Sequence, residues 1–527
     1  MHFDQLSVLL VCRRIISVLL LLTLSGLTAT AQTTPKADVW YPVYPVLQGK
    51  IHNPVARINL PASADGQNLE EIVVRLEEGN KGLENVQIFS TGRDSVFSAN
   101  RLLATANAGE SIRLKNDLPL RKGDNYLWVS LQPAEHLSPT DRLKVRVSAV
   151  IIDGKEHALP STDAPRLRAG IALRQPGEDS VDTYRIPGLV TTNAGTLIAA
   201  YDVRYNSSAD LQEDIDIGIN RSTDGGKTWQ PMQIIMDRGR WGGLPEAANG
   251  VGDPAILVDR TTGTLWVAGL WTHGYPGERA WDASGPGLTP AETGQFLLVK
   301  SDDDGQTWSE PINITEQIKD PDWTLLLQGP GRGITTRDGT LVFPAQYKDA
   351  DGMPYATIIA SRDHGQTWQI GTGAKSNTTE AQVVQLADGA LMLNMRDNRG
   401  GARSVYVTKD LGKSWTAHPT SRQALIEPVC MASIISHAYQ GKRFLLFSNP
   451  NSTEGRHRMT IKVSPDEGLT WPKEYQVLLD EGTGRGYSCL ASIDENTVGI
   501  LYESSQADLV FQKVPMEELL KTNQPNK

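Results

Sequence analysis

The sequence contains very little cysteine. Only three of its 527 residues are cysteines, at positions 12, 430 and 489. This number excludes the class of small secreted domains whose folds depend on several disulfide bonds. Cys430 and Cys489 either pair with each other or are both buried thiols.

An excess of positive charge is also missing. Lys and Arg together number 51 against 61 Asp and Glu, which gives a net charge of −10 and a pI near 5.5. Domains that bind nucleic acid need a basic surface to neutralise phosphates. The composition therefore argues against a nucleic-acid partner.

Long apolar runs are scarce. Arg13 and Arg14 precede one at residues 15–24, and a small-x-small cleavage signal ends at Ala31. The run is shorter than the about 20 residues that a membrane span needs, so the pattern predicts a signal peptide over residues 1–31. The alternative is an uncleaved membrane anchor. We expect an exported protein without a membrane span that is periplasmic, held at the cell surface or secreted.

What the sequence does contain is a repeat. The octapeptide Ser-x-Asp-x-Gly-x-Thr-Trp occurs five times, at residues 222–229, 301–308, 361–368, 408–415 and 464–471. Copies a few tens of residues apart indicate a propeller or another β-array. We expect the Asp to accept hydrogen bonds within its turn and the Trp to pack between strands, which is a structural role. The acidic triplet at residues 302–304 belongs to one copy and is not predicted to bind a metal.

Short apolar strands precede each octapeptide, and no segment before the C-terminal tail sustains a helical period of 3.6 residues. A region of about 360 residues suits six blades of roughly 60 residues each. We therefore predict an all-β chain with a six-bladed β-propeller over residues 166–527. One blade lacks an octapeptide, and we expect the first and last strands of the domain to meet there.

Residues 32–165 contain no repeat. Alternating apolar and polar residues at 71–76, 126–131 and 143–150 are typical of an antiparallel β-sandwich. We predict a smaller N-terminal β-sandwich domain, which either binds carbohydrate or packs on the main domain.

The motif Arg185-Ile186-Pro187 stands just ahead of the first octapeptide. In this order, the motif and the octapeptides (Asp boxes) resemble the bacterial exo-α-sialidases, or neuraminidases, of glycoside hydrolase family 33. The resemblance covers residues 166 to about 510, and members of this family are six-bladed propellers. It implies sialylated glycans of glycoproteins, glycolipids or oligosaccharides as substrates, no metal or organic cofactor, and a monomeric enzyme.

Sialic acid carries a carboxylate on its anomeric carbon, which calls for planar, permanently charged donors and hence for Arg rather than Lys. The resemblance implies that Arg185 and Arg396 are two of three such arginines. The third is Arg456 or Arg458, and Arg456 fits the motif better.

The same substrate carboxylate would repel a carboxylate nucleophile, and sialidases are the exception that uses Tyr. The resemblance implies Tyr487 as the nucleophile and Glu380 as the base that removes its proton, because a phenol with a pKa near 10 is otherwise a poor nucleophile. Glu503 resembles the carboxylate that orients the first arginine.

The leaving group needs a proton donor, and the resemblance implies Asp210 as the general acid/base on a loop. Arg204 is then expected at the rim of the substrate site, and Asp253 is expected to touch the glycerol or O4 side of the sugar. Glu213, Asp214 and Asp216 follow closely, so a shift of the assignment to one of them is an open alternative.

The implied reaction is retaining hydrolysis. Two other functions stay open at this point. A trans-sialidase would differ by aromatic residues at an acceptor site, which the sequence does not place. A non-catalytic propeller that binds sialoglycans would lack Tyr487, Glu380 or Asp210.

Overall fold

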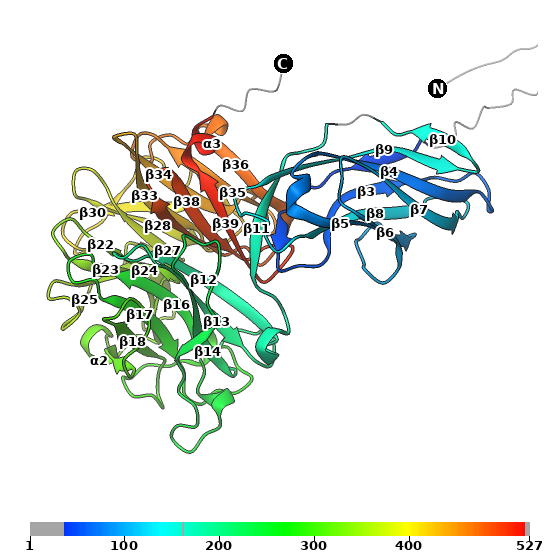
Figure 1. The fold of residues 1–527 in the computed structure, drawn as a ribbon. Helices are drawn as coiled ribbons and strands as arrows, with labels where there is room; N and C mark the ends of the chain where they lie inside the picture. Colours follow the sequence, from blue (N-terminus) through cyan, green and yellow to red (C-terminus); the bar gives the residue numbers. More distant parts are fainter. Residues whose placement is uncertain (1–35, 161–162, 522–527) are drawn as a thin grey trace, which may run out of the picture.

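The computed structural model describes residues 36–160 and 163–521, and it consists almost wholly of β-strands arranged in two domains (Figure 1). The predicted signal peptide at residues 1–31 lies outside the described residues. The short helical segments are α1 (Ala280–Ala283), α2 (Thr315–Ile318), α3 (Met516–Leu520), η1 (Asn80–Gly82), η2 (Glu178–Ser180), η3 (Glu246–Ala248) and η4 (Lys473–Tyr475). Within the described ranges, none of the helices has the length and apolar character needed to cross a membrane.

The N-terminal domain is a sandwich of two antiparallel sheets. One contains, in order, β1 (Asp38–Trp40), β3 (Asn53–Asn59), β8 (Tyr126–Pro133), β5 (Leu83–Gly92) and β6 (Leu102–Asn107). The other contains β9 (Arg142–Ile152), β4 (Asn68–Glu78) and β7 (Ser111–Pro119), with β10 (Lys155–Ala158) on β9. Buried residues alternate with exposed ones along β7 and with half-buried ones along β9, so that one face of each strand packs into a shared core.

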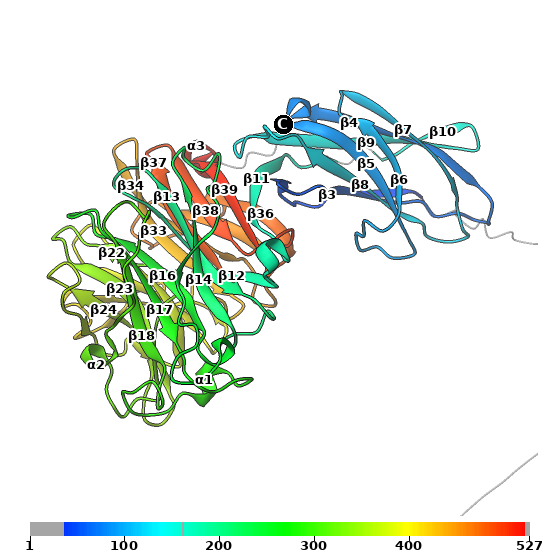
Figure 2. The ribbon, with the colours of Figure 1, turned by 60° about the horizontal axis from the view of Figure 1, so that its bottom comes forward.

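The two domains are joined through a strand that belongs to both. β11 (Leu167–Arg174) pairs with β9 of the sandwich, with β2 (Val46–Gln48) and with β39 (Leu509–Pro515) at the end of the chain. Arg168 and Arg142 both donate to Glu518 on α3, and the shorter of the two Arg168 contacts is 2.5 Å. The sandwich therefore lies beside the last blade of the second domain (Figure 2).

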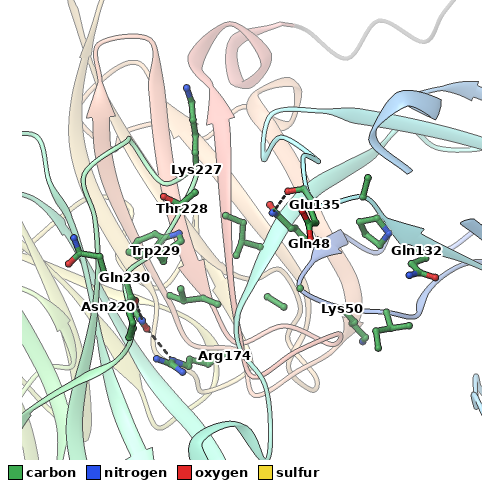
Figure 3. A pocket seen from close by; sticks show the side chains of 18 residues that line it. Gln48, Lys50, Gln132, Glu135, Arg174, Asn220, Lys227, Thr228, Trp229 and Gln230 are labelled. Carbon is green, nitrogen blue, oxygen red and sulfur yellow. Dashed lines mark hydrogen bonds between the residues drawn. The ribbon is translucent and has the colours of Figure 1, made fainter. Parts of the chain in front are cut away.

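A groove of about 650 Å³ lies between the domains, as Figure 3 shows. The sandwich contributes Gln48, Lys50 and Glu135, and the second domain contributes Arg174 and Trp229. Arg174 is held at the base of the groove because its Nε donates to the amide oxygen of Asn220 over 3.1 Å.

The second domain consists of six sheets that follow one another along the chain, as predicted for a six-bladed propeller. The first blade contains β12 (Thr183–Thr191), β13 (Leu197–Arg204), β14 (Ile215–Ser222) and β15 (Gln233–Met236). The second contains β16 (Val251–Val258), β17 (Leu265–Trp271), β18 (Gln295–Ser301) and β19 (Ile312–Asn313), with β21 (Gly331–Arg332) on β16. The third contains β20 (Leu325–Gln328), β22 (Ile334–Thr335), β23 (Leu341–Lys348), β24 (Pro354–Ser361), β25 (Gln369–Ile370) and β26 (Lys375–Ser376).

The other three blades complete the domain. The fourth contains β27 (Thr378–Gln385), β28 (Leu391–Asp397), β30 (Ser404–Thr408) and β31 (Thr416–Ala417), next to the small ladder of β29 (Gly401–Ala402) and β32 (Ile426–Glu427). The fifth contains β33 (Ser433–Tyr439), β34 (Lys442–Pro450), β35 (His457–Ser464) and β36 (Gln476–Thr483). The sixth contains β37 (Ser488–Asp494), β38 (Thr497–Tyr502), β39 and β11. The innermost strand β12 of the first blade contacts β16 on one side and β37 of the sixth blade on the other.

Counted outwards from the innermost strand of each sheet, each Asp box connects the third and fourth strands of one of the first five blades. In the box at residues 361–368, both Asp363 oxygens accept hydrogen bonds from Thr367, at 2.9 Å from the backbone N–H and 2.6 Å from the hydroxyl. Gly365 has a φ of +86°, and a Cβ there would lie 2.3 Å from the Trp266 ring. The sixth blade has no box because its fourth strand, β11, comes from the other end of the domain.

Replacing Asp363 by Ala is expected to lower the unfolding temperature by a few degrees at pH 7, equivalent to roughly 1–2 kcal/mol for the lost hydrogen bonds of a partly exposed carboxylate. The hydrogen bonds from Thr367 lower the pKa of Asp363 to about 2. A lowered pKa stabilises the fold above the unfolded value and loses this effect as pH falls through the folded value. The difference between wild type and variant in thermal unfolding should therefore shrink towards pH 2. The exposed Asp322→Ala is the matched control and should show no such difference at either pH.

Candidate active site

Irregularities at the start of three innermost strands turn polar side chains towards the propeller axis. The ladders of β12, β16 and β27 each shift register, between Arg185 and Gly188, Gly252 and Ala255, and Thr378 and Ala381. A β-bulge of this kind re-aims side chains at a strand end. The bulged segments contain Arg185, Asp253 and Glu380, so the same backbone device presents one polar group from each of three blades.

These groups line one cavity of about 270 Å³. Of the residues that the sequence suggested, seven face it: Arg185, Asp210, Asp253, Glu380, Arg396, Arg456 and Tyr487. They come from five of the six blades and are up to about 300 residues apart in the chain, so only the ring arrangement brings them together.

Tyr487 and Glu380 form a hydrogen-bonded pair at the base of the cavity, in which the phenol donates a short bond to Glu380 Oε1. Arg396 donates to both partners, over 2.7 Å to Glu380 Oε2 and 3.2 Å to Tyr487 Oη. Burial, and then the charge of Glu380, raise the pKa of Tyr487 well above its ordinary value. The phenol is therefore protonated in the free site and has a carboxylate placed to take its proton.

Glu503 is buried and connects the segment of Arg185 and Ile186 to the segment of Tyr487. It is 2% exposed, and it accepts from Arg185 Nε over 3.0 Å and from the backbone N–H groups of Ile186 (3.1 Å) and Tyr487 (2.9 Å). Burial alone would raise the pKa of Glu503, but Arg185 and the two N–H groups outweigh it and lower the pKa below its ordinary value. Ile186 is held at a φ of +58°, which is rare for a β-branched residue and which this contact helps to maintain.

Arg456 lies over the same tyrosine. Its guanidinium is 5.6 Å from the Tyr487 ring centroid and donates to the carbonyl of Arg485 over 3.0 Å. A Cβ at Gly486 would lie 3.0 Å from Arg456 Cβ, so only glycine allows this close approach. Arg458, the other candidate for this position, is exposed and does not line the cavity.

Asp210 lies at the opposite wall, on the loop that follows β13. Its Oδ1 accepts from Arg204 over 2.8 Å and from Arg185 over 3.4 Å, and about half of its side chain is exposed (54%). Burial acts to raise its pKa, but Arg204 and Arg185 dominate and lower it. Of the acidic residues in this loop that the structure describes, Asp210 is the one that lines the cavity.

Arg204 differs from its predicted place at the rim. It is 1% exposed, does not line the cavity and lies behind Asp210, with its other donors directed at Asp202 over 2.8 Å. Asp202 in turn accepts from the backbone N–H of Asp253 over 2.8 Å. Burial, and then the neighbouring charge of Asp202, raise the pKa of Asp253 well above its ordinary value, so the pKa values of Asp253 and Asp210 are shifted in opposite directions on this wall of the cavity.

Sequence reasoning missed several residues of the cavity wall, namely Leu211, Leu270, Arg279, Trp281, Leu325, Leu327, Gln346, Thr379 and Asn398. No motif marks them, because they lie on α1, on loops and on strands whose relative positions depend on the assembled ring. Both cysteines of the described ranges are free and buried. Cys430 packs against Tyr487 in a small apolar cluster, and burial raises the pKa of its thiol to about 12.

Comparison with known proteins gives matches over both domains. Residues 195–500 match the family described as BNR repeat-like domain, and residues 35–156 match the N-terminal domain of BNR-repeat neuraminidase. A sialidase of Bacteroides fragilis is 54% identical over 79% of this chain and 77% of its own length. A sialidase of Micromonospora viridifaciens is 34% identical over 73% of this chain and 58% of its own length. The solved structure of the Hadza microbial sialidase Hz136 matches with a TM-score of 0.87 and 48% identity, over 91% of this chain and 99% of that one.

Proposed function

Because the chain belongs to the family of BNR-repeat sialidases, we propose that it is an exo-α-sialidase, a glycoside hydrolase that releases terminal sialic acid from glycans. The observation that supports this most directly is the cavity, which combines Arg185, Arg396 and Arg456 with a tyrosine–glutamate pair. Each part answers a demand of a sugar that carries a carboxylate on its anomeric carbon.

Arg185, Arg396 and Arg456 are the groups that bind the substrate carboxylate. Their guanidiniums surround Tyr487, with those of Arg185 and Arg456 at 5.3 and 5.6 Å from its ring centroid. Planar donors match a carboxylate in a bidentate way, and a fixed arginine set loses little conformational freedom on binding. The anomeric carbon next to that carboxylate is then held above Tyr487.

Tyr487 attacks that carbon. As its Oη forms a bond with the anomeric carbon, the proton of the phenol passes to Glu380 and the glycosidic C–O bond breaks. Arg396 already donates to the phenolic oxygen and therefore stabilises the negative charge that develops there. The carboxylate of Glu380 and the developing tyrosinate offset the crowding of positive charge around the cationic transition state.

Asp210 supplies the proton for the leaving oxygen. In the free site it is ionised and paired with Arg185 and Arg204. A bound sialoside places its own carboxylate on Arg185, which removes one partner of Asp210 and adds a like charge nearby, so its pKa rises and it takes up a proton. In the second step Asp210 removes a proton from water, the water oxygen bonds to the anomeric carbon, and Tyr487 leaves with the proton returned by Glu380, so the configuration is retained.

The direct test is release of the fluorophore from a fluorogenic α-sialoside by the purified chain. Release at a rate proportional to enzyme, with free sialic acid as product, is expected. Binding of the sialoside without release would favour a non-catalytic glycan-binding propeller. Addition of excess lactose distinguishes hydrolysis from transfer, because a trans-sialidase would convert lactose to sialyllactose at the expense of free sialic acid.

Asp210→Asn is expected to lower kcat/KM for sialyllactose by about 10²–10³-fold but to lower it far less for an aryl sialoside, since kcat/KM reports the step in which the leaving group departs and a phenol leaves without needing a proton. The comparison of the two substrates is the measurement. Asp214→Asn, in the same loop but away from the cavity, is the matched control and should stay within twofold for both. An equal loss for both substrates in Asp210→Asn would reject the role as general acid.

We also propose that residues 1–31 are removed as a signal peptide and that the enzyme acts outside the cytoplasm as a monomer. Arg13 and Arg14, the short apolar run that follows them and the small residues Ala29 and Ala31 support export. The proposed mechanism needs no residue from a second copy of the chain. N-terminal sequencing of the natural product should begin at Gln32, and light scattering should give the mass of one chain.

A further inference from the structure

A second cavity, of about 260 Å³, lies at the other end of the innermost strands. Thr191 ends β12, Gln385 ends β27 and Ser492 lies near the end of β37, and all three line it. They follow Arg185, Glu380 and Tyr487 by six, five and five residues. At about 3.3 Å per residue, this cavity is roughly 17–20 Å along the strands from the active site.

The charged residues that line this cavity are all basic. Three arginines line it, Arg260, Arg332 and Arg443, and the lining residues that the structure describes include no Asp or Glu. Arg443 lies 3.8 Å from Glu467, outside the cavity wall. The other two donate to neutral oxygens, Arg332 to the Leu490 carbonyl over 3.2 Å and Arg260 to the Asn193 side chain over 3.1 Å.

The two arginines without a carboxylate partner among the described residues also repel each other. Burial, and then the charge of Arg332, lower the pKa of Arg260 to about 10. Burial likewise lowers the pKa of Arg332. Arg260 is exposed and Arg332 is half-buried, so an anion from solvent can reach both guanidiniums and would relieve the repulsion between their charges.

We propose that this cavity binds a small oxyanion, such as phosphate, sulfate or a carboxylate, between Arg260, Arg332 and Arg443. Planar guanidiniums bind such anions through paired N–H···O bonds, and one anion would neutralise the charges that now face each other. Arg332 lies on β21, which pairs with β16 of the second blade and precedes β22 of the third. Arg260 follows β16, and Arg443 lies on β34 of the fifth blade. The bound anion would therefore link separate blades near the axis and stabilise the folded propeller.

The test is thermal unfolding of the full chain in phosphate, sulfate and acetate, each compared with chloride at the same ionic strength. Stabilisation by an anion at about ten times its Kd is about 1.4 kcal/mol, which should raise the unfolding temperature of a chain of this size by about 1–2 °C. Titration calorimetry with inorganic phosphate measures the affinity, and the order of the three anions identifies the preferred oxyanion. Equal unfolding temperatures in all salts would overturn the proposal.

Variants separate this cavity from the active site, whose arginines also attract anions. Arg332→Gln and the more exposed Arg260→Gln should each weaken phosphate binding by at least tenfold and abolish the stabilisation, with kcat/KM for a sialoside unchanged. Arg396→Gln should keep the stabilisation although it damages the active site. The exposed Arg362→Gln is the matched control and should behave as wild type. If Arg396→Gln removes the effect and Arg260→Gln does not, the anion binds in the active site and the proposal is wrong.

Discussion

Tyr487→Phe is expected to lower kcat by about 10³-fold or more, because it removes the nucleophile and leaves the rest of the cavity in place. The phenyl ring keeps its packing against Cys430 and its contacts with the guanidiniums of Arg185 and Arg456. Glu380 keeps its 2.7 Å ion pair with Arg396, so no charge is left unpaired. Substrate affinity should therefore change little while turnover is lost, and steady-state kinetics on an aryl sialoside measures both.

A matched control separates loss of the phenol from loss of a buried hydroxyl in general. Tyr502 is also fully buried, and its hydroxyl donates to Gln512 over 3.3 Å away from the cavity. Tyr502→Phe should keep kcat within about twofold. Incubation with 2,3-difluorosialic acid should add one sugar to the peptide that contains Tyr487 in wild type, with fluoride released, and none in Tyr487→Phe. Full turnover by Tyr487→Phe, or labelling of another residue, would show that the nucleophile is elsewhere.

The fold was largely predictable because the Asp boxes are local. The hydrogen bonds of each box lie within the box, such as those from Thr367 to Asp363, so its turn can be predicted without knowledge of the rest of the chain. Counting boxes gives five blades, and the sixth is hidden because β11 and β39 come from opposite ends of the domain. The sheets of the structure confirm the all-β fold with an N-terminal β-domain.

Site residues were predictable where a β-bulge coincides with a recognisable motif that contains proline. Ile186-Pro187 and Asp253-Pro254 stand at the register shifts of β12 and β16, where proline suits a backbone that leaves the ladder. The rim position expected for Arg204 followed from the resemblance that makes Asp210 the general acid/base, and the structure instead buries Arg204 behind Asp210. Its burial depends on Asp202, two residues earlier on β13, which accepts from Arg204 over 2.8 Å.

The N-terminal domain shows where sequence reasoning stops. Its strands are visible as alternating stretches, but the pairing of Leu167 with Leu143 and the bonds from Arg168 to Glu518 join residues far apart in the chain. These contacts give the domain a packing role against the last blade. A carbohydrate-binding role for residues 32–165 stays a prediction.

Arg185→Ala is the second variant with a large expected effect, a fall in kcat/KM of about 10³-fold. Loss of a bidentate charge-assisted contact with the substrate carboxylate is worth roughly 4 kcal/mol, and each 1.36 kcal/mol is a factor of ten. The variant also leaves Glu503, which is 2% exposed, without its counter-ion. An unpaired buried carboxylate costs about 3–5 kcal/mol, so the unfolding temperature should fall as well.

The double variant Arg185→Ala/Glu503→Ala separates these two effects. Removing the stranded carboxylate should recover part of the unfolding temperature, because no buried charge is left without a partner. Activity should not recover, since the substrate still lacks its first arginine and Tyr487 loses the bond from its N–H to Glu503. Arg485→Ala, an exposed arginine nearby that does not line the cavity, should stay within threefold of wild type. If the double variant regained activity together with stability, Arg185 would act only by holding the fold, and binding of the substrate carboxylate would have to be assigned to Arg396 and Arg456.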